Sequence, residues 1–164
     1  MIIERTSTKA LKEAALVPTR AALGASMIFH GIDKVRAAEQ TGQHFEGMGI
    51  QPGKPWALAT GLSEVFAGVG AVLGLWTRPA ALAVLVTQAV AIWKVHGTKG
   101  YDMTKGGYEY NVALMAIAAG LLIAGPGAFS AHEGLETLMQ GRGARGLMRS
   151  ARPSPLLRFL KLIK

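Results

Sequence analysis

Polar and ionisable side chains interrupt stretches of this chain that otherwise consist of Ala, Val, Leu and Gly. The stretch SMIFHGIDK places His30 and Lys34 four residues apart, so both lie on one face if the stretch is helical. Glu64 is the only charged residue between positions 56 and 77. A carboxylate within an apolar helix needs a partner or a proton. These residue types therefore favour ion pairing, proton relay or the binding of a polar headgroup.

More polar residues lie near the ends of two further apolar stretches. We expect seven side chains to converge on one outward-facing polar chamber: His30, Lys34, Glu64, Lys94, His96, Glu109 and Asn111. Two interpretations stay open. Glu64 can form an ion pair with Lys34 or His30 that has only a structural role, or the chamber can bind a quinone-type headgroup or relay protons.

Metal and nucleophilic chemistry have weaker support. His30, His44 and His96 fall on the same side, but their spacing matches no ligand motif, so bis-histidine haem is not favoured and we predict no metal site. The chain contains no cysteine, which excludes thiolate chemistry. It also contains no nucleophile elbow, phosphate-binding glycine loop or paired catalytic carboxylates, so no catalytic residue is assigned.

Four apolar stretches are long enough to position these residues in a membrane. Half of the 164 residues are hydrophobic and 17% are charged. A helix that crosses a bilayer needs about 17 to 25 apolar residues, and we predict spans at 16–35, 56–77, 79–96 and 110–128. A soluble bundle would need a polar helix face, which NVALMAIAAGLLIAG does not supply. The fold class predicted is an all-α, multi-pass integral membrane four-helix bundle.

Helix-breaking residues divide the chain. Pro18 opens the first span, Pro79 suits the first turn of the third, and Gly125-Pro126-Gly127 stops the fourth. The second and third spans form a tight hairpin, and the longer, polar connections at about 36–55 and 97–109 lie opposite its turn. We predict an N-terminal segment at 1–15, a four-span domain at 16–135 and a basic tail at 136–164.

The distribution of cations predicts the orientation. Seven of the 18 Lys and Arg residues lie after position 141, on the side of both termini and of the hairpin turn. This excess predicts cytoplasmic termini and a location in the inner cell membrane. The N-terminus lacks an uninterrupted apolar core followed by a cleavage site, so we expect it to be retained. Arg20, within the first span, has no evident partner.

Small residues and the tail suggest contacts with other surfaces. Gly24 and Gly31 in the first span, and Gly70 and Gly74 in the second, would let helix backbones approach closely within lipid. At the C-terminus, Arg158, Lys161 and Lys164 alternate with apolar residues. This amphipathic end would lie on anionic lipid or dock onto a soluble protein; a solvated tail is the alternative. The cations lie at the ends of apolar spans, so no nucleic-acid partner is expected.

An ordered set of motifs resembles the DoxX family of small four-helix membrane proteins over residues 16 to 135. The motifs are FHGIDKV, a Gly-x-x-Glu pattern in GLSEVFAGVGAVLGL, the turn GLWTRPAAL, and YEYN opening a span that closes in GPGAFS. The resemblance maps the family's recurring positions onto Gly31, Lys34, Glu64, Thr77, Arg78, Glu109, Gly125, Pro126, Gly127 and Ser130. One position departs, because His132 stands where the family usually has an aspartate.

The resemblance implies an inner-membrane subunit that anchors or supports a redox complex, such as a quinone-linked oxidoreductase or an oxidative-stress complex. The expected partners are the lipid bilayer and other proteins of that complex, with a quinone as the cofactor that would fit. Activity of the chain on its own is not expected. The alternatives are a small transporter or proton relay that uses Glu64, and a structural subunit of another membrane assembly. No internal repeat relates the two halves, which counts against a transporter.

Overall fold

The computed structural model describes residues 2–146, and every regular element in that range is helical. This confirms the all-α class for the described part of the chain. The helices are α1 (Ile2–Arg36), α2 (Ala38–Gly47), α3 (Gly53–Leu73), α4 (Thr77–Ala91), α5 (Glu109–Ala124) and α6 (Ala131–Gly146). Between α4 and α5 lie the π-helical η1 (Ile92–His96) and the short 3₁₀ helices η2 (Gly97–Lys99) and η3 (Met103–Lys105).

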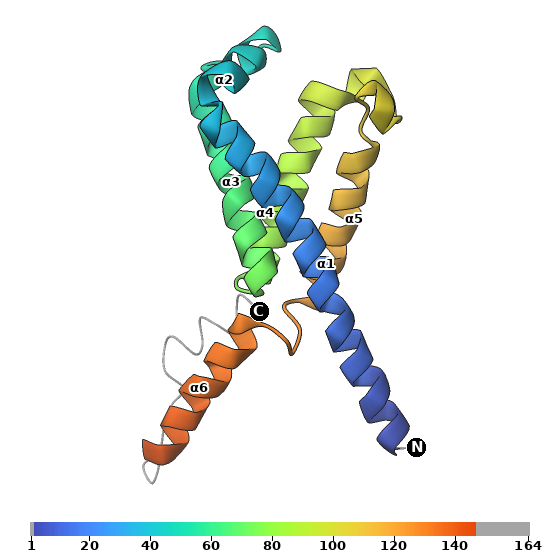
Figure 1. The fold of residues 1–164 in the computed structure, drawn as a ribbon, viewed down its shortest axis with the longest axis vertical. Helices are drawn as coiled ribbons and strands as arrows, with labels where there is room; N and C mark the ends of the chain where they lie inside the picture. The colour runs from blue at the N-terminus through green and yellow to red at the C-terminus, as the bar shows by residue number, and fades with distance from the viewer. Residues whose placement is uncertain (1, 147–164) are drawn as a thin grey trace.

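The long helices form two arms that diverge from a common end (Figure 1). Helices α1 and α2 pack against α3 in the first arm, and α4 packs against α5 in the second. The α3–α4 hairpin joins the arms at what we call the turn end, where α6 also begins (Figure 1). At the opposite end, α2 caps the first arm and residues 97–108 cap the second; we call this the cavity end. The four predicted spans fall mainly on α1, α3, α4 with η1, and α5.

The hairpin turn is made by a glycine cap. Gly74 has φ 65° and ψ 33°, a left-handed conformation that glycine adopts without a steric penalty. The N–H of Leu75 donates to the Gly70 carbonyl at 3.0 Å, which satisfies a carbonyl at the end of α3. Pro79 lies in the first turn of α4, where a missing N–H costs no intrahelical hydrogen bond. The turn therefore sets α3 and α4 antiparallel.

Paired glycines bring α1 and α3 into backbone contact. A Cβ on Gly24 would lie 2.6 Å from the Gly68 carbonyl oxygen, and one on Gly31 would lie 2.6 Å from that of Gly61. The glycines are seven residues apart on each helix, so they meet pairwise in an antiparallel register. Close approach through small residues is a main means by which helices associate in lipid. We call these four glycines the glycine seam.

The four glycines singled out in the sequence have three different roles. Gly24 and Gly31 lie in the seam, but their partners are Gly61 and Gly68. Gly70 faces α4, because a Cβ there would lie 3.2 Å from that of Ala80. Gly74 forms the turn and leaves room for the guanidinium of Arg20.

Small apolar side chains fill the region where the arms meet. The buried cluster is composed of Leu23, Met27, Ala67, Ala80, Ala81, Val84, Leu114, Ala118 and Leu121. Four of its nine members are alanines, so the helices approach closely here as well. The cavity described below lies between the arms on the side of this cluster that faces the cavity end.

Within residues 2–146, two helical segments are long and apolar enough to cross a membrane, Gly53–Leu73 and Thr77–Lys99, and α5 is apolar but shorter. Only 39% and 22% of the residues in their most apolar windows are buried. The apolar side chains that face outward include Phe66 and Val69 on α3 and Leu82 and Val86 on α4. The core helix of a soluble protein would be mostly buried, so this exposure is typical of helices that face lipid.

Helix α1 holds the linker that leads from α5 to α6. The Glu13 carboxylate accepts the N–H of Ala128 at 2.8 Å, and Arg20 donates to the carbonyl of Phe129. The hydroxyl of Ser130 accepts the N–H of Glu133 at 3.2 Å and so caps the start of α6. Arg20 is only 3% exposed. A side chain with no evident partner in the sequence thus binds a backbone carbonyl more than a hundred residues away.

The glycine seam predicts that Gly31→Ala lowers stability. The new methyl group would meet the backbone of Gly61 and force α1 away from α3, which we expect to cost about 1 to 3 kcal/mol, as overpacking does in cores. The matched control is Gly120→Ala in α5, where a Cβ meets nothing within 4 Å. Thermal unfolding in detergent checks the prediction, and equal midpoints for the two variants would contradict it.

The clamp on the linker predicts that Arg20→Met loosens the start of α6. A spin label at Leu138, which is 66% exposed, should become more mobile in the variant because the bond to Phe129 is gone. Arg36→Met, in the last turn of α1, is the control. Electron paramagnetic resonance spectra measure the mobility, and identical spectra for Arg20→Met and Arg36→Met would refute the clamp.

Candidate functional site

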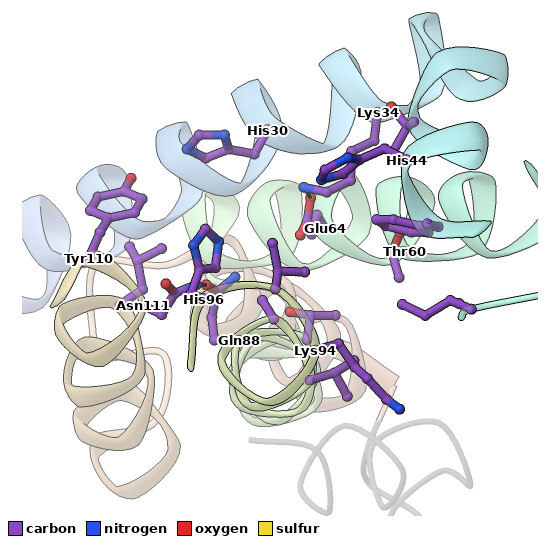
Figure 2. A pocket seen from close by; sticks show the side chains of 18 of the residues that line it. His30, Lys34, His44, Thr60, Glu64, Gln88, Lys94, His96, Tyr110 and Asn111 are labelled. Atoms are coloured by element: carbon purple, nitrogen blue, oxygen red, sulfur yellow. Dashed lines mark hydrogen bonds and ion pairs between the residues drawn. The ribbon is translucent and has the colours of Figure 1, made fainter. Parts of the chain in front are cut away.

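A cavity of about 440 Å³ opens between the two arms at the cavity end. Its walls come from α1, α2, α3, α4, η1, α5 and the segment around Gly106. Six of the seven polar residues predicted from the sequence line it: His30, Lys34, Glu64, Lys94, His96 and Asn111 (Figure 2). Glu109 does not; it is exposed, and its carboxylate accepts the N–H of Met103 at 3.3 Å.

A charged pair between α1 and α3 forms one side of the cavity. The ammonium nitrogen of Lys34 lies 2.7 Å from Oε2 of Glu64, and the Glu64 side chain is only 6% exposed (Figure 2). A buried carboxylate is strongly disfavoured without such a partner. Of the two partners proposed from the sequence, Lys34 is the one that pairs. Its ammonium group has three N–H donors, so it can donate to a further acceptor in the cavity.

Two amides link α4 and α5 on the other side. Nδ2 of Asn111 donates to Oε1 of Gln88 at 2.8 Å, and each residue is 6% exposed. The Gln88 amide nitrogen lies 3.8 Å from the sulfur of the core residue Met27. Gln88 was not among the predicted site residues, although a lone amide in the stretch AVLVTQAVAIW signals a buried polar contact. Each arm therefore contributes one polar pair to the cavity.

The two predicted histidines make different contacts. His30 packs edge-on against Tyr110 of α5, with ring centroids 5.8 Å apart, and so bridges the arms. Nδ1 of His96 lies 2.7 Å from the carbonyl oxygen of Gly106. Because a carbonyl only accepts, Nδ1 must carry the proton, and Nε2 of the neutral ring is then an acceptor. His96 is the last residue of the π-helical η1. π-Helices are rare overall, and those that occur are frequently found at functional sites.

Residues 97–108 fold into a compact cap over this histidine. The N–H of Tyr108 donates to the backbone carbonyl of Gly100 at 3.1 Å, and the N–H of Gly107 donates to the backbone carbonyl of Asp102 at 2.9 Å. The hydroxyl and the N–H of Thr104 donate to the Asp102 carboxylate, which lowers the pKa of that exposed group. A carboxyl whose pKa is lowered in the folded protein stabilises the fold while it is ionised, and this stabilisation is lost as the pH falls through the lowered pKa. Asp102 is therefore ionised at neutral pH and keeps its bonds to Thr104.

Helix α2 forms the remaining wall and was not predicted, since the sequence indicated only a polar connection at 36–55. Its sequence AEQTGQHFEG has no long apolar stripe. It is held on α3 by an ion pair of Glu39 with Lys54 at 2.7 Å and by the Glu46 carboxylate, which accepts the N–H of Gly53 at 3.0 Å. Its side chains Thr41, His44 and Phe45 line the cavity.

The residues of the sequence motifs divide between the two ends of the molecule. Lys34 and Glu64 line the cavity, with Gly31 in the seam beneath them. Thr77, Arg78, Gly125, Pro126, Gly127 and Ser130 lie at the turn end, where Nε of Arg78 donates to the Leu122 carbonyl at 3.2 Å. His132 is fully buried there, in the first turn of α6. Arg158, Lys161 and Lys164 lie outside the described residues.

The cavity can hold a small molecule but has no arrangement for a metal ion. No group of three or more His, Asp or Glu side chains in the described part of the chain could hold one. The cavity offers donors from Lys34 and the amides, and acceptors from Asn111 and His96. Such a set recognises a ligand that presents oxygen atoms on an apolar body.

Comparison with known proteins supports the motif assignment over residues 15–97. The family model described as DoxX matches residues 15–97, about half of the chain, and this range includes Lys34, Glu64, Arg78 and His96. No curated protein and no solved structure matches the chain. The extent of the match, together with the apolar helices, shows that this chain belongs to the DoxX family of small membrane proteins.

Proposed function

We propose that this protein is an integral membrane subunit that supports a quinone-linked redox complex and offers its cavity to the polar headgroup of a quinone. The observation that carries the proposal is the cavity itself. Two polar pairs face one space between apolar helices: half-buried Lys34 with buried Glu64, and Gln88 with Asn111, both buried. Buried polar groups are costly within a membrane, so their convergence on a cavity favours a ligand-binding role.

The cavity suits a quinone headgroup in size and in chemistry. Its volume of about 440 Å³ lies within the usual range for small-molecule sites, roughly 300 to 1,000 Å³. Carbonyl oxygens of the ligand would accept from Lys34 and from the amide nitrogens. The unprotonated nitrogen of His96 would accept from a hydroxyl of the reduced form. The aromatic ring would pack among Phe45, Tyr110 and Leu114, which also line the cavity.

In this proposal α1, α3, α4 with η1, and α5 form a transmembrane four-helix bundle at residues 16–135. Helix α1 has 35 residues and is roughly 50 Å long, which exceeds a hydrocarbon core of about 30 Å. Its first turns, residues 2–15, would therefore project from the membrane on the side of the turn end. The excess of Lys and Arg on that side favours a cytoplasmic location for both termini in the inner membrane.

Protein partners would bind at the cytoplasmic end. The basic tail at 136–164, with Arg158, Lys161 and Lys164, would dock onto a soluble subunit or onto anionic lipid. Such a subunit would carry out the redox reaction, while the membrane protein anchors it.

A proton relay through Glu64 is the second candidate function. It is favoured by one observation, namely that this carboxylate is buried within a candidate membrane span and yet lines a cavity. Intramembrane carboxylates in pumps and transporters commonly carry protons. A pH-dependent proton flux in proteoliposomes that Glu64→Gln abolishes would support this candidate over the first.

The charged pair predicts a non-additive effect on stability. Glu64→Gln should cost on the order of 2 kcal/mol because it leaves the Lys34 ammonium without its counter-charge. Lys34→Met combined with Glu64→Gln should recover most of that loss. Thermal unfolding of the single and double variants in detergent measures the coupling. Strictly additive losses would show that the pair contributes nothing.

Purification from the native membrane tests the proposed role. An N-terminal tag, gentle solubilisation and mass spectrometry should recover a soluble oxidoreductase or a respiratory complex in near-stoichiometric amount. Truncation after Ser154 should weaken this association, because it removes Arg158, Lys161 and Lys164. Recovery of the protein alone would argue against a subunit role and in favour of a self-sufficient transporter.

A further inference from the structure

The rim of the cavity carries large apolar side chains, and its floor carries buried polar ones. Five of the residues that line the cavity are exposed: the apolar Trp56 (51%), Val90 (42%) and Met103 (54%), and the polar His44 and Lys94. The lining residues Glu64, Gln88 and Asn111 are buried. The floor of the cavity therefore presents polar side chains, and the mouth has an apolar part formed by Trp56, Val90 and Met103.

One face of α3 runs from the mouth of the cavity to its floor. Trp56, Thr60 and Glu64 follow one another at intervals of four, so they lie in line along the cavity wall. Eight residues of helix span about 12 Å. A ligand whose head contacts Glu64 or Lys34 would therefore have a path of about that length before it reaches the mouth at Trp56.

The mouth lies at the level of residues that favour a membrane interface. Trp93 is 74% exposed, and the ammonium group of Lys94 lies 4.0 Å from the centre of its ring. Trp and Lys residues near helix ends are typical anchors at the boundary between headgroups and acyl chains. Val90 is one turn away from Lys94 on the same helical segment. The apolar part of the mouth, at that level, would meet lipid at the boundary between headgroups and acyl chains.

We propose that the cavity takes a single-tailed, lipid-soluble quinone, whose head binds at the polar floor and whose apolar tail leaves between Trp56 and Val90 into the bilayer. This inference rests on the proposed quinone site and adds the tail, its path and the route of entry. The ligand reaches the site sideways from the membrane and leaves the same way. Tail recognition is separate from head recognition, because the floor and the mouth are formed by different residues.

The experiment compares two quinones with the same headgroup, one without a tail and one with two isoprene units. The full chain carries Trp76→Phe and Trp93→Phe, so Trp56 is the only remaining tryptophan of three. Quenching of its fluorescence in lipid nanodiscs gives the dissociation constants. The mouth variant is Val90→Asn. Its matched control is Val86→Asn, on the same helix, where Val86 is 55% exposed but does not line the cavity.

We expect the tailed quinone to bind about tenfold more tightly than the tailless one, a difference of about 1.4 kcal/mol. Val90→Asn should remove most of that advantage and leave the tailless quinone unaffected, whereas Val86→Asn should change neither. Partition of the tail into lipid is the same for all variants, so it cannot produce this pattern.

The contrary outcomes separate the two proposals. If both quinones bind and Val90→Asn affects them no more than Val86→Asn does, the tail path is wrong while the headgroup site stands. If neither quinone quenches Trp56, the headgroup site and the tail path are both wrong.

Discussion

The close backbone contact between α1 and α3 is the constraint on which the rest of the structure depends. Water does not drive helices together inside a bilayer, so association relies on tight packing and polar contacts. Gly24 meets Gly68 and Gly31 meets Gly61, which brings the two backbones together along the length of the seam. Lys34 can then reach Glu64 at 2.7 Å and compensate its charge. A wider separation of α1 and α3 would leave the Glu64 carboxylate unpaired in an apolar helix. The charged pair therefore depends on the glycine seam.

Polar side chains have different roles at the two ends of the molecule. At the cavity end the arms diverge, and their polar pairs face an accessible space. At the turn end polar side chains bind backbone instead: Arg20 donates to Phe129, Glu13 accepts from Ala128, and Arg78 donates to Leu122. These contacts tie the ends of the helices together at the turn end, whereas a cavity separates the arms at the cavity end. A site for a ligand and an anchor for a partner can therefore occupy opposite ends of a small protein.

Much of this arrangement follows from local sequence patterns. Helical spacing places His30 and Lys34 on one face, and depth along two antiparallel helices brings Glu64 to Lys34, so six of the seven expected residues reach the cavity. Glu109 fails because it lies at the first turn of α5, where it bonds with the cap. The partner of Arg20 is a backbone carbonyl, which no residue type reveals. Helix α2 lacks an apolar stripe and is held by Glu39 and Glu46, so its pattern alone could not predict it.

In the proposed complex, the polar head of a ligand occupies the space between the arms. Photo-crosslinking can locate that head: a quinone with an azide on its ring is irradiated with the full chain in native lipid, and the labelled peptides are mapped by mass spectrometry. We expect labels on the cavity walls, at His30 and Lys34 in α1 and at Gln88 and Asn111 in the second arm, and we expect excess unlabelled quinone to suppress them. Labels confined to the outward faces of the helices, such as Phe66 and Val69 on α3, would contradict this placement of the head.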